Sequence, residues 1–168
     1  MVLNVQWDLG QEAARDIAAY LNALLADAFA LLLKTKGCRW NVSGPHFPSH
    51  QLLFREFEEQ INAAIDGIAE RIRRIGATAL ISIGDISRVR RLVDIDIGSL
   101  SALEMLAVLL EDNLQLIAYL REAHCLCEGY GDVATACRLE KWIDDAEGRA
   151  RNLFSTCRPT QGPNTTAA

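Results

Sequence analysis

Positive charge is scarce in this chain of 168 residues. It has three lysines and 14 arginines, acidic residues outnumber basic ones by 22 to 17, and the formal net charge is −5 at pH 7. The first 14 residues contain neither lysine nor arginine, and residues 158–168 contain only Arg158. A protein that binds DNA phosphates or an anionic membrane needs clustered positive charge. The sequence therefore argues against both kinds of partner.

The sequence also lacks the features of an exported or membrane-spanning protein. Residues 1–10 show neither the basic nor the apolar segment of a secretory signal. The longest apolar stretch, residues 17–33, is interrupted by Asn22 and Asp27 and is shorter than the roughly 20 residues that span a bilayer. Five cysteines is an odd number, and a chain of this length does not need disulfide bonds. We expect a cytoplasmic protein without a transmembrane helix.

Half of the residues are hydrophobic, and they recur at helical spacing in four long blocks. These blocks cover residues 11–36, 48–75, 103–127 and 132–155. The turn Gly44–Pro45 separates the first two blocks. Ser101 followed by Glu104 is typical of a capping box before the third, and Asp132 is a suitable N-cap for the fourth. The sequence therefore predicts four long helices.

The helical pattern weakens between the second and third blocks, where ALISIG and LVDIDIG resemble short strands around a polar segment. We expect an irregular crossover carrying one short helix. Two helices, a long crossover and two more helices make an all-α, ferritin-like four-helix bundle. The first helix is apolar around much of its circumference, which predicts a second buried surface and hence an oligomer. We expect a single domain over residues 1–168, with a loose tail from about residue 158.

No Glu-x-x-His motif occurs in the chain, and a di-iron centre in the core of a bundle normally uses that motif. We therefore do not expect such a centre. Asp66 and Glu70, four residues apart on one helical face, are the candidate metal ligands. This spacing is equally typical of a solvated helical face.

Residues 20–76 resemble the Dps family, the small ferritin relatives known as miniferritins or DNA-binding proteins from starved cells. The motif W-N-V-x-G-P-x-F begins at Trp40, and D-x-I-A-E-R begins at Asp66. The resemblance implies a four-helix subunit of a hollow, dodecameric cage with a role in the stress response. It also implies iron storage, with Fe²⁺ oxidised by hydrogen peroxide at sites shared between two subunits.

The five ligand positions implied by this resemblance are substituted at three places. They correspond to Arg39, Gln51, Arg55, Asp66 and Glu70, of which only the last two keep a carboxylate. A guanidinium group cannot ligate iron, and its charge repels Fe²⁺. We expect the ferroxidase site to be weakened or lost, with Arg39 or Arg55 pairing with Asp66 or Glu70 instead.

Three residues near this site leave alternatives open. His50 adjoins Gln51, and a small change of register would bring it into the site as a ligand. His46, in the turn, is expected to face a loop or an interface. Trp40 is either an oxidisable ring beside the metal site or an apolar residue that fills the subunit interface.

A second group of potential ligands lies near the junction of the last two helices. It comprises His124, Cys125, Cys127 and Cys137. Imidazole and thiolate suit Zn²⁺, but residues 125 and 127 point about 200° apart on a helix. We expect small buried residues at helix ends instead, and we assign no role to Cys38 or Cys157.

Two functions are consistent with these observations. The first is an iron-storing cage that protects against peroxide and Fe²⁺, and the alternative is a structural or scavenging cage that does not oxidise iron. The carboxylates of Asp112, Asp144 and Asp145 are candidates for lining a pore, although a solvated surface would carry the same residues.

Overall fold

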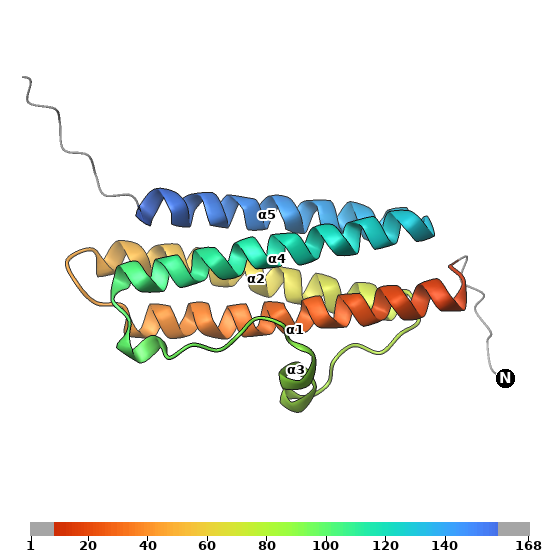
Figure 1. The fold of residues 1–168 in the computed structure, drawn as a ribbon, viewed down its shortest axis with the longest axis horizontal. Coiled ribbons are helices and arrows are strands. Elements are labelled where there is room, and N and C mark those ends of the chain that lie inside the picture. Colours follow the sequence, from red (N-terminus) through yellow and green to blue (C-terminus); the bar gives the residue numbers. More distant parts are fainter. Residues whose placement is uncertain (1–8, 158–168) are drawn as a thin grey trace, which may run out of the picture.

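The structure, a computed structural model, describes residues 9–157 and shows an all-α bundle. Its elements are α1 (Gln11–Asn41), α2 (Phe47–Arg74), α3 (Ile83–Val89), the 3₁₀ turn η1 (Ile97–Ser99), α4 (Ala102–Tyr130) and α5 (Val133–Cys157). The four long helices lie side by side, and the crossover between α2 and α4 runs outside α1 (Figure 1). The predicted four-helix bundle with a short crossover helix is confirmed. The predicted tail at 158–168 lies outside the described residues.

The helix boundaries follow the capping residues closely. The Ser101 side chain accepts the Glu104 N–H at 3.3 Å, and the Glu104 carboxylate accepts the Ser101 N–H at 2.8 Å, so the predicted capping box is confirmed. Asp132 accepts the Thr135 N–H at 3.1 Å and caps α5. The chain reverses before α5 at Gly131, whose φ of 73° favours glycine.

The predicted end of the first helix at residue 36 was too early, because α1 continues to Asn41 through Gly37. The fully buried Cys38 packs into the bundle core, and this tertiary contact outweighs the low helix propensity of glycine. A Cβ at residue 37 would lie 3.2 Å from Ile97 Cδ1, so the missing side chain also lets η1 approach the helix.

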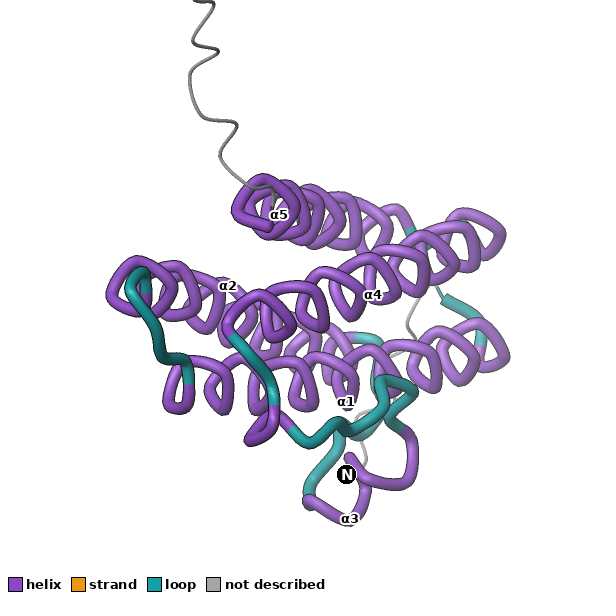
Figure 2. Tube along the Cα trace, turned by 60° about the vertical axis from the view of Figure 1, so that its left-hand side comes forward, coloured by secondary structure: helices purple, strands orange, loops and turns teal. Residues whose placement is uncertain are grey.

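The core is formed by the facing sides of two helical hairpins, α1 with α2 and α4 with α5 (Figure 2). Its largest fully buried side chains include Phe54, Phe57, Leu21, Leu24 and Leu31. Gly67 of α2 allows a close approach, because a Cβ there would lie 3.0 Å from the Trp142 ring of α5. The two hairpins therefore pack over most of the bundle length.

The strand-like segments of the crossover are not strands: ALISIG runs into α3 and LVDIDIG into η1, and polar residues of α1 hold the crossover along the helix. Asn22 donates to the Thr78 carbonyl and accepts the Leu80 N–H, both at 3.1 Å. Lys34 donates to the Val93 carbonyl at 2.7 Å. The side chains of α1 thus replace the neighbouring strand that these segments would need.

Asp27 is the centre of this attachment and is fully buried. Its carboxylate accepts the backbone N–H groups of Arg91 and Leu92 at 2.6 and 3.1 Å, and Arg91 Nε donates to it at 2.9 Å. The Arg91 guanidinium also lies 3.6 Å from the centre of the Tyr119 ring on α4. One buried ion pair therefore joins α1, α4 and the crossover.

Among the described residues, α1 is the one helix whose length and apolar composition would suit a membrane span. Half of its most apolar window is buried against the rest of the bundle. The core helix of a bundle passes the same test.

Candidate functional site

Arg39 and Gln51, two of the positions that the family resemblance assigns to metal ligands, lie together where α1 turns into α2. Arg39 is in the last turn of α1 and Gln51 near the start of α2. The short connection contains Gly44, whose φ of 101° allows the reversal. Gln51 Nε2 donates to the Arg39 carbonyl at 3.3 Å. The hairpin thus places these two positions side by side.

The Arg39 side chain is engaged by a carboxylate that the sequence analysis missed. Arg39 Nε donates to Glu58 Oε1 at 2.6 Å, and Lys36 Nζ donates to Glu58 Oε2 at 3.2 Å. The Glu58 side chain is only 8% exposed. Its position could have been noticed, because Gln51, Arg55 and Glu58 follow each other at i, i+4 and i+7 on one face of α2. A triad of one buried carboxylate and two partly exposed cations therefore occupies this end of the hairpin.

The remaining three positions also lie on α2, at two places along the helix. Arg55, Asp66 and Glu70 are all exposed, and the Glu70 carboxylate lies 3.7 Å from the guanidinium of Arg74, one turn further on. Eleven residues separate Arg55 from Asp66, a rise of about 16 Å along a helix. Within one chain neither Arg39 nor Arg55 contacts Asp66 or Glu70. The expected pairing therefore stays a prediction about two chains.

Trp40 lies on the outer side of α1 and is 60% exposed. It borders a groove of about 790 Å³ between α1 and the crossover, whose other apolar residues include Phe29, Leu33, Ile83 and Ile97. Leu33 and Ile83 are also exposed. The single chain thus leaves a contiguous apolar surface uncovered, which agrees with the second buried surface expected for the first helix.

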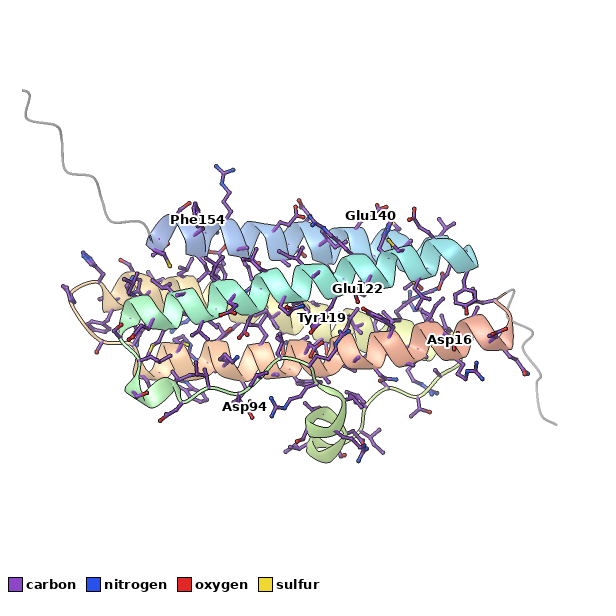
Figure 3. All side chains as sticks on the ribbon, in the orientation of Figure 1. Asp16, Asp94, Tyr119, Glu122, Glu140 and Phe154 are labelled. Atoms are coloured by element: carbon purple, nitrogen blue, oxygen red, sulfur yellow. The ribbon has the colours of Figure 1, made fainter. Side chains whose placement is uncertain are left out.

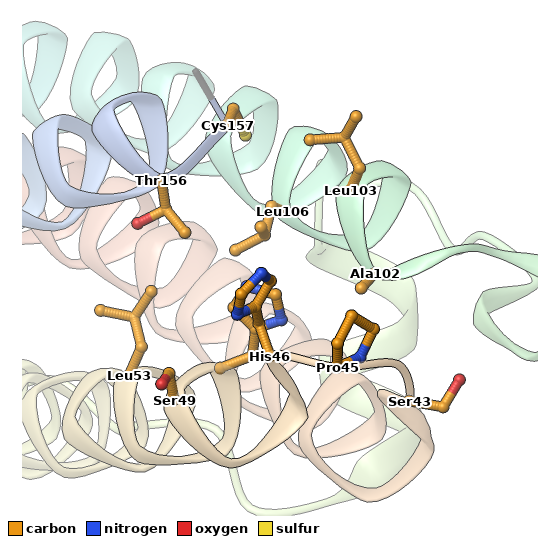
Figure 4. A pocket seen from close by; sticks show the side chains of 11 residues that line it. Ser43, Pro45, His46, Ser49, Leu53, Ala102, Leu103, Leu106, Thr156 and Cys157 are labelled. Carbon is orange, nitrogen blue, oxygen red and sulfur yellow. The ribbon is translucent and has the colours of Figure 1, made fainter. Parts of the chain in front are cut away.

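His50 lines a pocket that Arg39 does not border. Figure 4 shows this space of about 700 Å³ between the α1–α2 turn, the start of α4 and the end of α5. His46 and Cys157 line it as well. Burial, and then the neighbouring His46, lower the pKa of His50. A ligand role for His50 stays a prediction that the single chain does not support.

The cysteines divide by helical face. Cys38 and Cys127 are buried, and burial raises the pKa of each thiol to about 12. The expectation of burial is wrong for Cys125 and Cys137, which are exposed. Cys125 falls midway between the buried Ala123 and Cys127 and therefore points to the opposite side of α4.

Within residues 9–157, no group of three or more His, Cys, Asp or Glu side chains is arranged to hold a metal ion. The bundle interior instead holds Arg149, which donates to Asn113 Oδ1 at 2.9 Å. Burial lowers the pKa of Arg149 to about 10. Asp112, a candidate for a pore, is largely buried and pairs with Lys34 at 2.6 Å. Its carboxylate is therefore not a free surface group.

Residues 18–158 match the ferritin-like domain family. The chain is 37% identical over 114 residues to an uncharacterized low temperature-induced protein of Nostoc sp., covering 68% of this chain and 64% of that relative, just under two-thirds of its length. It is 32% identical over 140 residues to the DNA protection during starvation protein of Agrobacterium fabrum, covering 83% of this chain and 75% of that one.

Solved structures agree with this fold. DpsC from Streptomyces coelicolor superposes with a TM-score of 0.90 at 22% identity, covering 94% of this chain and 92% of that one. A Dps protein from Bacillus brevis superposes with a TM-score of 0.85 at 25% identity, covering 89% and 99%.

Proposed function

The chain belongs to the Dps family of ferritin-like proteins, and on that premise we propose that it is the subunit of a hollow, dodecameric cage in the cytoplasm. The cage stores iron and limits damage by Fe²⁺ and peroxide, and its usual ferroxidase site is weakened or lost. The name of the Agrobacterium relative, a DNA protection during starvation protein, supports the protective role.

The uncovered apolar surface supports assembly from copies of the same chain. Leu33 is 65% exposed, Trp40 60% and Ile83 84%, and all three border one groove. Large apolar patches of this kind are rare on monomeric proteins. A second copy would bury this surface of α1 and α3.

The weakened ferroxidase site rests on one observation, the pairing of Arg39 with the buried Glu58. Lys36 and Arg39 share this carboxylate, and the guanidinium of Arg55 is exposed on the same face of α2. Fe²⁺ prefers oxygen and imidazole ligands, and arginine offers neither. A shared site would then receive its negative charge from Asp66 and Glu70 of another copy. Ion pairs between these carboxylates and Arg39 or Arg55 of the first copy would hold the contact together without a metal.

Peroxide-dependent oxidation of Fe²⁺ by the purified full-length protein tests this proposal. We expect the natural protein to oxidise Fe²⁺ at close to the buffer rate. The triple variant Arg39→His, Gln51→His and Arg55→Asp restores the implied ligand set and should accelerate the reaction at least tenfold.

A control variant carries Asn62→His and Arg151→Asp, which add the same residue types at exposed positions elsewhere. It should behave like the natural protein. Rapid oxidation by the natural protein that is lost when Asp66 is changed to Asn would show that the arginines do not disable the site.

The alternative function, a structural or scavenging cage that does not oxidise iron, is favoured by the same Arg39–Glu58 pair. The two functions differ in whether iron accumulates inside the cage. After aerobic loading with Fe²⁺ and gel filtration, an iron-storing cage retains many iron atoms per subunit, whereas the alternative retains none above a serum albumin control.

DNA binding is not part of the proposed function, because neither terminal segment offers a basic arm. In a gel-retardation assay at about 50 mM salt we expect no shift of duplex DNA. A shift that disappears as salt is raised would reveal a phosphate-binding surface that the charge distribution does not predict.

A further inference from the structure

A small cavity of about 20 Å³ lies between the four long helices of the bundle. Its apolar wall receives residues from α1, α2, α4 and α5, among them Leu24, Ile61, Leu116 and Trp142. Leu120 of α4 also borders it, next to Tyr119, which Figure 3 labels midway along that helix. Arg149 and Asp145 of α5 are the charged residues of the described lining.

The Arg149 side chain is buried without a direct ion pair. The residue is 4% exposed, and within residues 9–157 no carboxylate oxygen lies within 4.0 Å of its guanidinium nitrogens. The carboxylate of Asp145, one turn earlier on α5, is partly exposed and pairs with Lys141 at 2.8 Å. Burial lowers the pKa of Arg149 to about 10, an effect that outweighs the opposite influence of Asp145. A buried charge without a close partner is unfavourable, so an anion beside Arg149 would stabilise it.

Hydrogen-bond donors also remain available at the cavity. Arg149 Nε donates to Asn113 Oδ1 at 2.9 Å, and Nη1 donates to Gln60 Oε1 at 3.4 Å. Neither N–H of Arg149 Nη2 has an acceptor in the part of the chain that the structure describes. The same holds there for the indole N–H of Trp142, a residue that is 7% exposed. Buried donors without a protein acceptor are rare, and a bound ion or water is a usual explanation.

The size of the cavity restricts its occupant to one small particle. A single water-sized sphere needs about 10–15 Å³, so the volume suits one water molecule or one halide ion and is too small for phosphate or a carboxylate ligand. A buried water needs about two to four polar partners, including acceptors for its own protons. The wall is mainly apolar, and Arg149 and Trp142 offer donors. Chloride only accepts hydrogen bonds and carries a negative charge, so it fits this wall better than water does.

We propose that the centre of the bundle binds one chloride ion per chain, held by the guanidinium of Arg149 and the indole N–H of Trp142. The ion neutralises the buried guanidinium and contacts all four long helices. It therefore binds the folded chain and stabilises it. The site lies within one chain, is separate from the positions that resemble metal ligands, and does not rest on the proposed function.

Crystals of the full-length protein in which sodium bromide replaces sodium chloride test the position of the ion. Bromide is the probe, because its anomalous scattering distinguishes it from water. We expect one anomalous peak per chain in the cavity, within hydrogen-bond distance of Arg149 Nη2. A cavity without an anomalous peak, including one that holds a water molecule, overturns the proposal.

Thermal unfolding of the full-length protein tests binding in solution. Sodium chloride replaces sodium gluconate at constant ionic strength and one protein concentration, because gluconate is too large for the cavity. The melting temperature should rise by about 3–6 °C when the chloride concentration is about ten times its Kd, and should then level off. This rise should vanish in Arg149→Met and persist in Arg121→Met. Arg121 is the matched control, because its loss changes the charge equally but its side chain is 63% exposed.

Trp142→Phe tests the second donor, because it keeps an aromatic ring and removes the indole N–H. It should raise the chloride Kd roughly twofold to tenfold, the contribution of one hydrogen bond. A chloride-dependent rise that Arg149→Met retains overturns the site. If Arg149→Met does not fold, bromide diffraction from the natural protein decides the proposal alone. None of these measurements bears on iron oxidation, which is measured separately.

Discussion

Replacing Asp27 by alanine should destabilise the protein far more than removing any exposed carboxylate. Asp27 is fully buried, accepts two backbone N–H groups and one guanidinium N–H, and joins the crossover to α1. Removing one partner of a buried ion pair costs about 3–5 kcal/mol, much of it from the polar groups left unpaired. Because Arg91 stays 26% exposed and keeps its contact with Tyr119, we expect about 4 kcal/mol.

This loss would lower the melting temperature by about 8–16 °C for a domain of this size. The assay is urea unfolding followed by circular dichroism, with all variants at one protein concentration, because dissociation of an oligomer makes the midpoint depend on concentration. Asp94→Ala is the matched control. It removes an ion pair of the same crossover, between Arg90 and Asp94 at 2.6 Å, but the carboxylate is 80% exposed.

An exposed pair contributes about 1 kcal/mol or less, so Asp94→Ala should leave the midpoint nearly unchanged. Asp27→Asn, which keeps the shape and one acceptor oxygen, should fall between the two. If Asp27→Ala and Asp94→Ala cost the same, the buried pair does not hold the crossover and the argument is wrong.

Three further predictions concern the thiols, one histidine and one cap. Iodoacetamide should modify the exposed Cys125 and Cys137 in the native protein, and Cys38 only after unfolding. Burial shields the Cys38 thiol and raises its pKa to about 12. Mass spectrometry of tryptic peptides identifies each modified cysteine. Because the pKa of His50 is lowered in the folded protein, the unfolded chain binds a proton at this histidine more readily, and the free energy of unfolding falls as the pH drops below about 6.5. His50→Gln should therefore reduce the fall in the urea midpoint between pH 7 and pH 5. An unchanged fall in this variant would refute the prediction. Ser101→Ala removes the capping box of α4 and should cost about 1 kcal/mol in the same urea assay, whereas no change would mean that the cap adds nothing.

The bundle could be predicted from the sequence because its signals are local. Apolar residues at helical spacing mark the four long helices, and the Ser101–Glu104 box and Asp132 mark two of their starts. The position of Cys137 was missed for the opposite reason. Whether a residue near a helix end is buried depends on which neighbouring element covers it, and no local pattern records that.

The crossover shows where sequence periodicity misleads. Alternating apolar residues in LVDIDIG imitate a strand, but a strand needs a neighbouring strand, and this chain offers α1 instead. The two residues that interrupt the long apolar run of α1 are the ones that hold the crossover. Asn22 binds Thr78 and Leu80, and Asp27 binds Arg91 and Leu92. Each polar residue inside this apolar helix therefore marks a tertiary contact with the crossover. From the sequence alone, the same residues show only that the apolar stretch is interrupted.

The candidate site could be predicted only in part, because Arg55 lies about 16 Å from Asp66 along α2 and the five positions can meet only across two chains. What one chain does fix is the partner of Arg39. Arg39 and Lys36 share the buried carboxylate of Glu58, so the Arg39 guanidinium is engaged before any partner is present. Asp66 and Glu70 are exposed, and Glu70 lies 3.7 Å from Arg74 of the same helix. On the proposed function, copies of one chain that bring Arg39 or Arg55 to Asp66 or Glu70 would form ion pairs at the contact, and these pairs would take the place of the metal there.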